Sequence, residues 1–306
     1  MFKKSSLLVL CISLLINPVL QVSAAEKLPE FKKLLANANK VTALPKNISP
    51  SLLKVSESRN KWFSSNCTTD FSSTDLYQCT AGNLNGKKLI IVYGDSHATM
   101  WLTAIDSIAK SKDYKVLLLA KLACPIVQKT IWSYQLSKPF TECDEWNAKA
   151  VELIGKLQPE VLIVSNQWKP AVQDGAKDDF GTTALWKAEF PKALNNLRKL
   201  TQKFIVIGNN PSMTTDPLRC ASKPRQNLLL CASLTNNADN HIINQIEKDA
   251  ALSNGASYIN TVDVACTDLL CPVVINGLFV YFDQWHFTDQ YVKFLTPWLA
   301  SQLKIS

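Results

Sequence analysis

The chain has 306 residues, of which 47% are hydrophobic and 19% are charged, and its formal net charge is +8. This composition is typical of a globular protein with one or two domains, and it excludes long disordered regions, which combine low hydrophobicity with an excess of one charge. The basic residues are dispersed rather than gathered in a patch, so the sequence gives no sign of a nucleic-acid partner. A solvated basic surface explains the charge, and weak attraction to anionic envelope polymers is the alternative.

Residues 1–24 have the pattern of a secretory signal peptide. Lys3 and Lys4 precede an interrupted apolar run, and small residues follow it up to Ala24. The run is shorter than the roughly 20 residues that a membrane-spanning helix needs, so a retained anchor is the weaker alternative. We therefore expect the protein to be exported, to the periplasm or the cell exterior.

The next segment, residues 25–86, is predicted to form an N-terminal arm. Its pattern indicates helices over 30–35 and 51–63, followed by a Ser/Thr-rich loop between Cys67 and Cys79. The main domain is predicted to span residues 87–306.

The cysteines support export. One of the nine, Cys11, lies in the predicted signal peptide, and the other eight fall into pairs of sequence neighbours. An even number of cysteines favours disulfides and an oxidising compartment, and neighbour pairing is the simplest of many connectivities. A zinc site is the alternative, but the chain has three histidines and no Cys-x-x-Cys. The pairs are Cys67/Cys79, Cys124/Cys143, Cys220/Cys231 and Cys266/Cys271.

From residue 87 onward, short apolar runs alternate with segments of helical periodicity. This alternation predicts an α/β fold, a three-layer sandwich with a five-stranded parallel sheet of flavodoxin-like topology. The active site of such a fold lies at the carboxyl ends of the strands. The predicted strands are 89–93, 116–120, 161–164, 204–207 and 257–262, and the predicted helices are 98–109, 145–157, 185–200, 240–251 and 288–303, the last with a break at Pro297.

The first of these strands runs into Gly94-Asp95-Ser96-His97, directly before a helix. A serine at a strand end and a helix N-terminus lies where the helix dipole favours negative charge, which suits a nucleophile whose product is an oxyanion. Asp and Ser are also ordinary N-cap residues, so this motif alone leaves a capping role open.

A base for such a serine is found near the C-terminus. Asp283 precedes His286 by three residues, a spacing that lets the carboxylate reach the imidazole and fix its tautomer. Their segment precedes the last predicted helix, so it too belongs to the carboxyl edge of the sheet. The alternative is a capping aspartate beside a loop histidine.

Taken together, the Gly94–His97 and Asp283-x-x-His286 motifs resemble the first and last blocks of the SGNH hydrolase superfamily. The chain is most similar to the SGNH domain of acyltransferase-3-type O-acetyltransferases, over about residues 43–306. Further similarities are Cys124-Pro125 after the second strand and Trp168 after the third.

The resemblance implies a catalytic triad with Ser96 as nucleophile, His286 as base and Asp283 as its orienting partner. It also implies an oxyanion hole, in which the Ser96 amide is one donor and Asn166 is a candidate for another. The superfamily has a glycine that supplies an amide after the second strand, and the chain departs from this pattern, because its second strand ends in Ala120-Lys121-Leu122-Ala123 without a glycine. Trp168 and Trp285 are candidates for a sugar-stacking surface, with core packing as the alternative.

The expected function is therefore an exported serine-dependent O-acyl transferase or esterase, with acetyl as the implied acyl group. Its implied substrate is an envelope polysaccharide, a lipopolysaccharide sugar or peptidoglycan, and a separate membrane acyltransferase is the expected acyl donor for the transfer reaction. We expect no metal or other cofactor. The alternatives are a non-catalytic carbohydrate-binding or assembly component with the same fold, and a lipase or thioesterase.

Overall fold

The structure is a computed structural model that describes residues 24–63, 66–168, 179–238 and 240–306. The predicted signal peptide lies outside these residues, apart from Ala24. None of the helices described is both long and apolar enough to cross a membrane.

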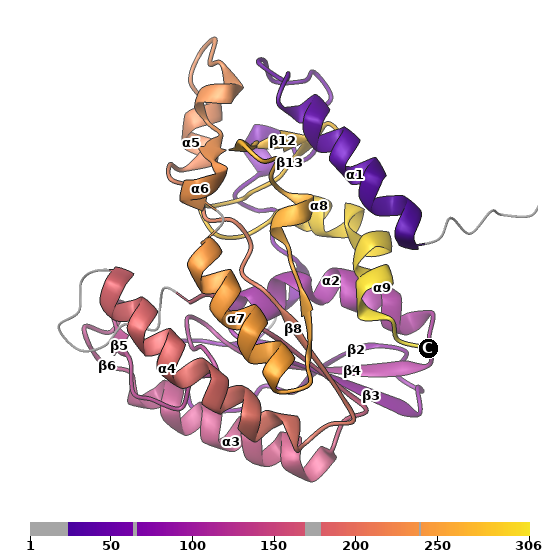
Figure 1. The fold of residues 1–306 in the computed structure, drawn as a ribbon, viewed down its shortest axis with the longest axis vertical. Helices are drawn as coiled ribbons and strands as arrows, with labels where there is room; N and C mark the ends of the chain where they lie inside the picture. Colours follow the sequence, from indigo (N-terminus) through magenta and orange to yellow (C-terminus); the bar gives the residue numbers. More distant parts are fainter. Residues whose placement is uncertain (1–23, 64–65, 169–178, 239) are drawn as a thin grey trace, which may run out of the picture.

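At the centre of the fold lies a seven-stranded sheet covered by helices on both faces (Figure 1). Five strands run parallel in the order β4-β3-β7-β8-β10, which is the predicted flavodoxin-like order. The predicted α/β three-layer sandwich is therefore confirmed. The strands are β3 (Lys88–Gly94), β4 (Tyr114–Lys121), β7 (Val161–Ser165), β8 (Lys203–Ile207) and β10 (Ser257–Ile259).

Two further strands extend the sheet beyond the predicted five. β1 (Thr68–Thr69) pairs with β4 in parallel, and β2 (Cys79–Gly82) pairs with β4 in antiparallel. Both come from the predicted N-terminal arm, so this part of the arm belongs to the same sheet. The sequence did not indicate β1 and β2 because they are short and lack an alternating apolar pattern.

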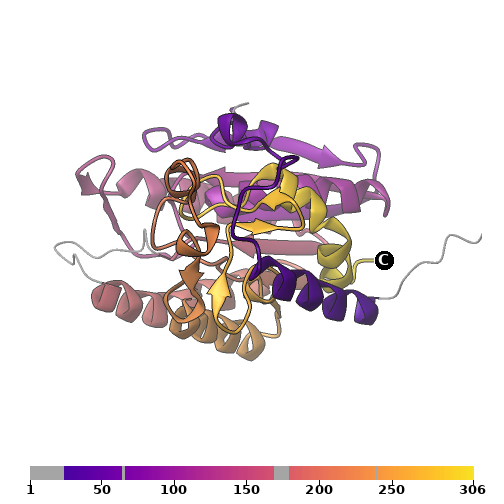
Figure 2. The ribbon, with the colours of Figure 1, turned by 90° about the horizontal axis from the view of Figure 1, so that it is seen from above.

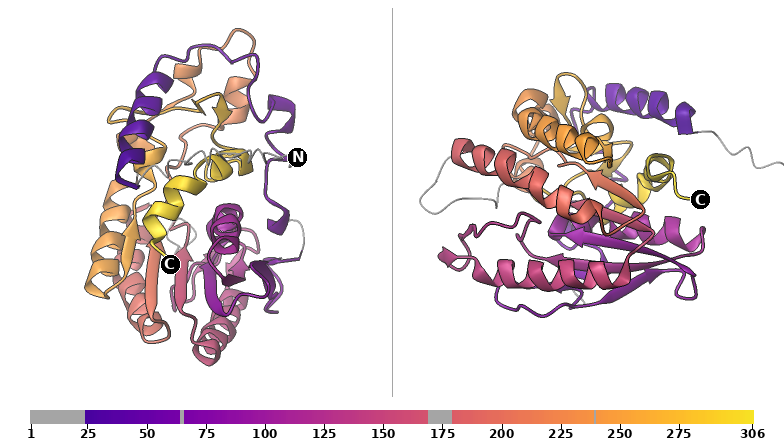
Figure 3. Two further views of the ribbon diagram at one scale, coloured as in Figure 1. Left: turned by 90° about the vertical axis from the view of Figure 1, so that its right-hand side faces the viewer. Right: turned by 60° about the horizontal axis from the view of Figure 1, so that its bottom comes forward.

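Alternate residues of each strand face opposite helical layers, as expected for a buried parallel sheet. Ile90 and Val92 of β3 face α2 (Ser96–Lys110), whereas Ile91 and Tyr93 face the layer of α3 (Thr141–Leu157), α4 (Asp179–Arg198) and α7 (His241–Ser253). Figure 3 shows these layers from two directions.

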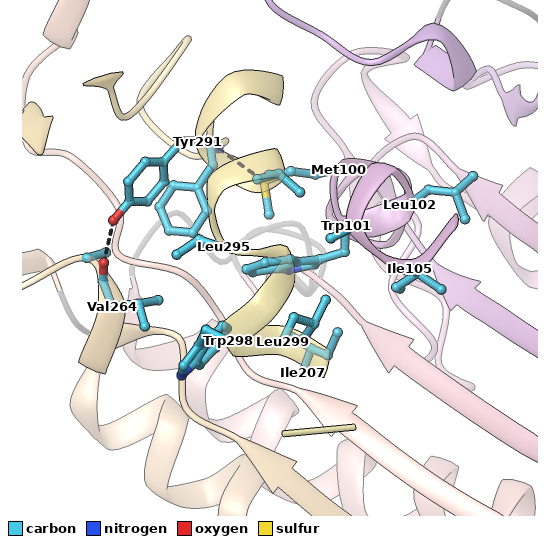
Figure 4. Packing of buried hydrophobic residues seen from close by; sticks show 14 of the residues in the cluster. Met100, Trp101, Leu102, Ile105, Ile207, Val264, Tyr291, Leu295, Trp298 and Leu299 are labelled. Carbon is cyan, nitrogen blue, oxygen red and sulfur yellow. Dashed lines mark hydrogen bonds between the residues drawn. The ribbon is translucent and has the colours of Figure 1, made fainter. Parts of the chain in front are cut away.

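The last predicted helix is divided near Pro297, into α8 (Asp289–Phe294) and α9 (Thr296–Leu303). Trp101 of α2 is fully buried against α8 and α9, with its ring 5.9 Å from Phe287 and 6.4 Å from Trp298 (Figure 4). This packing fixes α2 against the segment that carries Asp283 and His286.

The predicted helix over 51–63 is not formed. Two 3-10 turns stand there instead, η1 (Leu52–Lys54) and η2 (Lys61–Phe63). Ser58 and Asn60 are buried between them and bond to the main domain, because Ser58 donates to Gln290 and Asn60 Nδ2 donates to the Thr99 carbonyl over 2.7 Å. Such side chains compete with helical hydrogen bonding and fix the segment against the main domain. We call residues 52–63 the strap.

The first helix of the described chain, α1 (Ala24–Ala38), is longer than the predicted 30–35 and runs beside α9 (Figure 2). The remaining elements are short and form hairpins and turns around the sheet. They are β5 (Trp132–Ser133), β6 (Lys138–Pro139), α5 (Pro217–Ala221), η3 (Leu228–Leu230), β9 (Ser233–Leu234), α6 (Thr235–Ala238), η4 (Val262–Val264), β11 (Leu270–Cys271), β12 (Val274–Ile275) and β13 (Leu278–Phe279).

All eight cysteines from Cys67 onward form disulfides between sequence neighbours, which confirms the simplest predicted pairing. Four disulfides favour an oxidising compartment and so an exported protein.

Candidate active site

Ser96 is the first residue of α2, at the carboxyl end of β3. The preceding Asp95 caps the helix, since its Oδ1 accepts from the His97 amide over 2.9 Å. Gly94 has a φ of +152°, and a Cβ there would lie 2.1 Å from the Ser165 carbonyl oxygen of β7. Only glycine therefore lets β3 and β7 remain paired up to the turn that presents Ser96.

Three side chains predicted to act together do lie together. His286 Nε2 is 2.8 Å from Ser96 Oγ, and His286 Nδ1 is 2.9 Å and 3.0 Å from the two oxygens of Asp283. With its Nδ1 proton directed at the carboxylate, the imidazole can accept the Ser96 proton at Nε2.

Asp283 is fixed by its own loop. Its Oδ1 accepts from the amides of Trp285 and His286, each over 2.8 Å. Burial acts to raise its pKa, but the hydrogen bond and charge of His286, together with the two amides, hold the pKa of Asp283 below its usual value. The carboxylate is thus kept ionised, as a partner that orients an imidazole must be.

The His286 ring packs against three other rings, of which Phe63 is 6.0 Å away and perpendicular to it. Phe282 stacks on it with centroids 5.1 Å apart and planes inclined by 8°, and His97 lies at 4.8 Å. His97 is fully buried, and this burial, followed by the charge of His286, lowers the pKa of His97 well below its usual value. A neutral His97 limits the rotation of His286 without adding a second charge beside it.

A pocket of about 520 Å³ opens over the triad. Its lining is rich in aromatic side chains, among them Trp132, Tyr134, Phe282 and Trp285, and includes Ser96, Asp283 and His286. Trp285 is 40% exposed and lines the pocket, whereas Trp168 is buried in the core on the side of α3, α4 and α7 and does not line it.

Asn166 is buried at the end of β7 and does not line the pocket. Its Oδ1 accepts from the Ile126 amide over 3.2 Å, so it ties the loop after β4 to β7. That loop does line the pocket, through Leu122 and Ala123. Ala123 has a φ of +51°, the left-handed conformation that favours glycine.

The Ala123 amide has no acceptor among the described residues, whereas the neighbouring Leu122 and Cys124 amides bond to Thr69 and Lys121. The Cys124–Cys143 disulfide holds the loop on its other side. The Ala123 amide is therefore free to donate to a ligand in the pocket.

Gln167 is a pocket residue that sequence reasoning missed. It is 7% exposed, and neither its carboxamide oxygen nor its nitrogen has a partner in the described chain. A buried amide without a partner is costly and in native sites marks a group reserved for a ligand or water. Its place directly after Asn166 was the only signal in the sequence.

A series of buried polar residues leads from the turn that presents Ser96 to α7. Asp95 Oδ2 accepts from the Gln167 amide, Asn209 Oδ1 from the Trp168 amide, and Glu247 Oε1 from Asn209 Nδ2 over 2.6 Å. Burial raises the pKa of Glu247 to about 8 and that of Asp95 to about 7.

Glu247→Gln is expected to flatten the pH dependence of the free energy of unfolding. A carboxyl whose pKa is raised from 4.5 to about 8 in the folded state stabilises the fold fully below pH 4.5, and this contribution is lost as the pH rises towards 8. Glutamine keeps the acceptor oxygen and does not titrate. Urea unfolding at several pH values measures the slope, with the exposed Glu57→Gln as control. An unchanged slope in Glu247→Gln would show that this carboxyl is already ionised in the folded protein.

Comparison with known proteins points to one family. The model of the SGNH domain (fused to AT3 domains) matches residues 66–301. No curated protein sequence matches the chain. The described residues also contain no group of three or more His, Cys, Asp or Glu side chains arranged to hold a metal ion.

Solved structures are also similar to the chain. The periplasmic domain of a lipopolysaccharide acetyltransferase from Salmonella ser. Paratyphi A is 17% identical, with a TM-score of 0.54 over 91% of this chain and 95% of that chain. A mutant of Axe2, an acetyl-xylooligosaccharide esterase from Geobacillus stearothermophilus, is 8% identical, with a TM-score of 0.46 over 73% of this chain and 97% of that chain.

Proposed function

Because the chain belongs to the family of SGNH domains fused to AT3 domains, we propose that it transfers or removes an O-acyl group on an envelope glycan through an acyl-serine intermediate at Ser96. The observation that carries the proposal is the continuous hydrogen-bond chain from Asp283 through His286 to Ser96, at the base of an aromatic pocket. Acetyl is the acyl group we propose, since the lipopolysaccharide enzyme of the same fold is an acetyltransferase.

In the first step, Ser96 Oγ attacks the carbonyl carbon of the donor ester while His286 Nε2 takes the hydroxyl proton. The negative charge moves to the carbonyl oxygen, where we propose the Ser96 and Ala123 amides as donors, with Asn166 as the alternative to Ala123. Protonated His286 then gives its proton to the leaving oxygen, the old ester bond breaks and acyl-Ser96 remains.

In the second step, a hydroxyl attacks acyl-Ser96 while His286 Nε2 accepts its proton, and His286 then returns this proton to Ser96 Oγ as the acyl-serine bond breaks. When water attacks, a carboxylic acid leaves and the protein is an esterase. When a sugar hydroxyl attacks, a new sugar ester forms and the protein is a transferase. For the transferase direction, we propose a separate membrane acyltransferase as the acyl donor.

The test uses p-nitrophenyl acetate, a donor that needs no membrane partner. The purified protein is incubated with this ester, with and without an oligosaccharide acceptor, and free acetate, acetylated sugar and acetylated peptide are measured by mass spectrometry. Acetate or acetylated sugar together with an adduct on the Ser96 peptide supports the proposal and separates the two directions. Absence of both products, or an adduct on another residue, would contradict it and favour a binding protein with an SGNH fold.

A further inference from the structure

Arg59 stands at the rim of the pocket on a segment that is fixed from both sides. Its neighbours Ser58 and Asn60 are both 5% exposed and bond to the main domain, and the Ser58 carbonyl also accepts from the Asp289 amide over 3.1 Å. Arg59 itself is exposed and lines the pocket. The strap therefore holds the backbone at residue 59 while its side chain is directed towards the site.

The Arg59 guanidinium is held against aromatic rings. Its Cζ lies 4.9 Å from the centroid of Phe282 and 5.9 Å from that of Phe63. Phe282 in turn stacks on His286, so the guanidinium and the His286 imidazole contact the same ring. Contact with ring faces restrains a guanidinium and leaves the N–H donors at its edge available for bidentate bonds.

Those donors have no acceptor in the described part of the chain. No carboxylate there forms an ion pair with Arg59, and its guanidinium donates no hydrogen bond. The other charges of the pocket are already engaged, since Asp283 is bonded to His286 and Asp95 accepts from two amides. Among the charged residues that line the pocket, Arg59 is thus the one without an ion-pair or hydrogen-bond partner for its side chain in the described chain.

We propose that Arg59 binds an anionic group on the glycan, so that the enzyme acts on acidic sugars. Aromatic faces such as that of Trp285 fit a sugar ring, and the guanidinium edge fits a carboxylate or a phosphate. This inference rests on the proposed function, because it takes the pocket over Ser96 to be the glycan site. A uronic acid and a sugar phosphate share the required chemistry, and the experiment separates them.

Binding is measured by calorimetry with the Ser96→Ala protein, so that turnover does not interfere. The probes are trigalacturonic acid against its methyl ester, and glucose 6-phosphate against glucose. We expect the anionic member of at least one pair to bind about tenfold to hundredfold more tightly, as for hydrogen bonds to charged groups. The preference should weaken with added salt and disappear in Ser96→Ala/Arg59→Gln.

The matched control is Ser96→Ala/Arg219→Gln, which removes the same charge from the exposed Arg219 of α5, outside the pocket. This control should keep the preference. Tighter binding of trigalacturonic acid than of its methyl ester would identify the anionic group as a carboxylate. Tighter binding of glucose 6-phosphate than of glucose would identify it as a phosphate, and either result supports the proposal. Equal binding within each pair, or a preference that survives Arg59→Gln, would overturn it.

A kinetic arm separates this inference from the proposed function. The ratio of kcat/KM for acetylated trigalacturonate to that for its acetylated methyl ester should fall towards one in Arg59→Gln and stay unchanged in Arg219→Gln. Charge-dependent binding in a protein without acyl chemistry would support the Arg59 site and refute the enzyme. Turnover by the wild type with a kcat/KM ratio of one, together with no binding preference, would support the enzyme and refute the Arg59 site.

Discussion

Replacing Ser96 by alanine is expected to lower kcat for ester cleavage by about 10⁴- to 10⁶-fold, the range found when a member of a catalytic triad is removed. The hydroxyl makes its hydrogen bond to His286 Nε2, so its loss removes the attacking atom and leaves the rest of the site in place. The measurement is the single-turnover release of p-nitrophenol, with the melting temperature followed in parallel to show that the fold persists.

Ser107→Ala is the matched control, because Ser107 is an exposed residue of the same helix, α2. It should retain the wild-type rate. The double variant Ser96→Ala/His286→Ala should be no slower than Ser96→Ala, since the base has nothing left to activate. A Ser96→Ala protein with more than a tenth of the wild-type kcat would exclude Ser96 as the nucleophile.

Asp283→Asn is expected to lower kcat by about 10⁴-fold with little change in stability. Asparagine keeps the oxygen that accepts from the Trp285 and His286 amides, so the loop is retained. Its amide group can donate to His286 Nδ1 and so favours the tautomer with the proton on Nε2, which cannot accept from Ser96.

The kinetic defect is checked with the same ester, and the tautomer is checked by the ¹⁵N chemical shifts of the imidazole. Asp268→Asn makes the same chemical change at an exposed position and should have no effect. If Asp283→Asn loses activity while the Nδ1 tautomer persists, the carboxylate acts through its charge and not through orientation.

The sequence was sufficient for the fold because the five central strands are buried on both faces. Runs such as Leu89–Tyr93 are continuous and apolar, and they alternate with helical segments, which leaves few arrangements of a parallel sheet. Ser96, Asp283 and His286 could be named for a related reason, since the ends of such strands meet at one edge. The distances between these three side chains could be obtained only from the structure.

What could not be predicted depends on contacts distant in sequence. Residues 51–63 have a helical pattern, but the bond of Asn60 to the Thr99 carbonyl, 39 residues away, competes with helix formation. The sequence therefore did not indicate that Arg59 faces the site. Ala123 was misleading for a different reason, because the side chain reports poorly on a backbone conformation that the surrounding loop imposes.

The pairing of the cysteines has a consequence for biosynthesis. Each disulfide joins two cysteines that follow one another along the chain, and the partners are 12, 19, 11 and 5 residues apart. A thiol oxidase that links cysteines in the order in which they emerge from a translocation channel would produce the native set directly. Maturation should then need an oxidant but no isomerase, whereas Ser96 and His286, 190 residues apart, meet only after the whole chain has emerged.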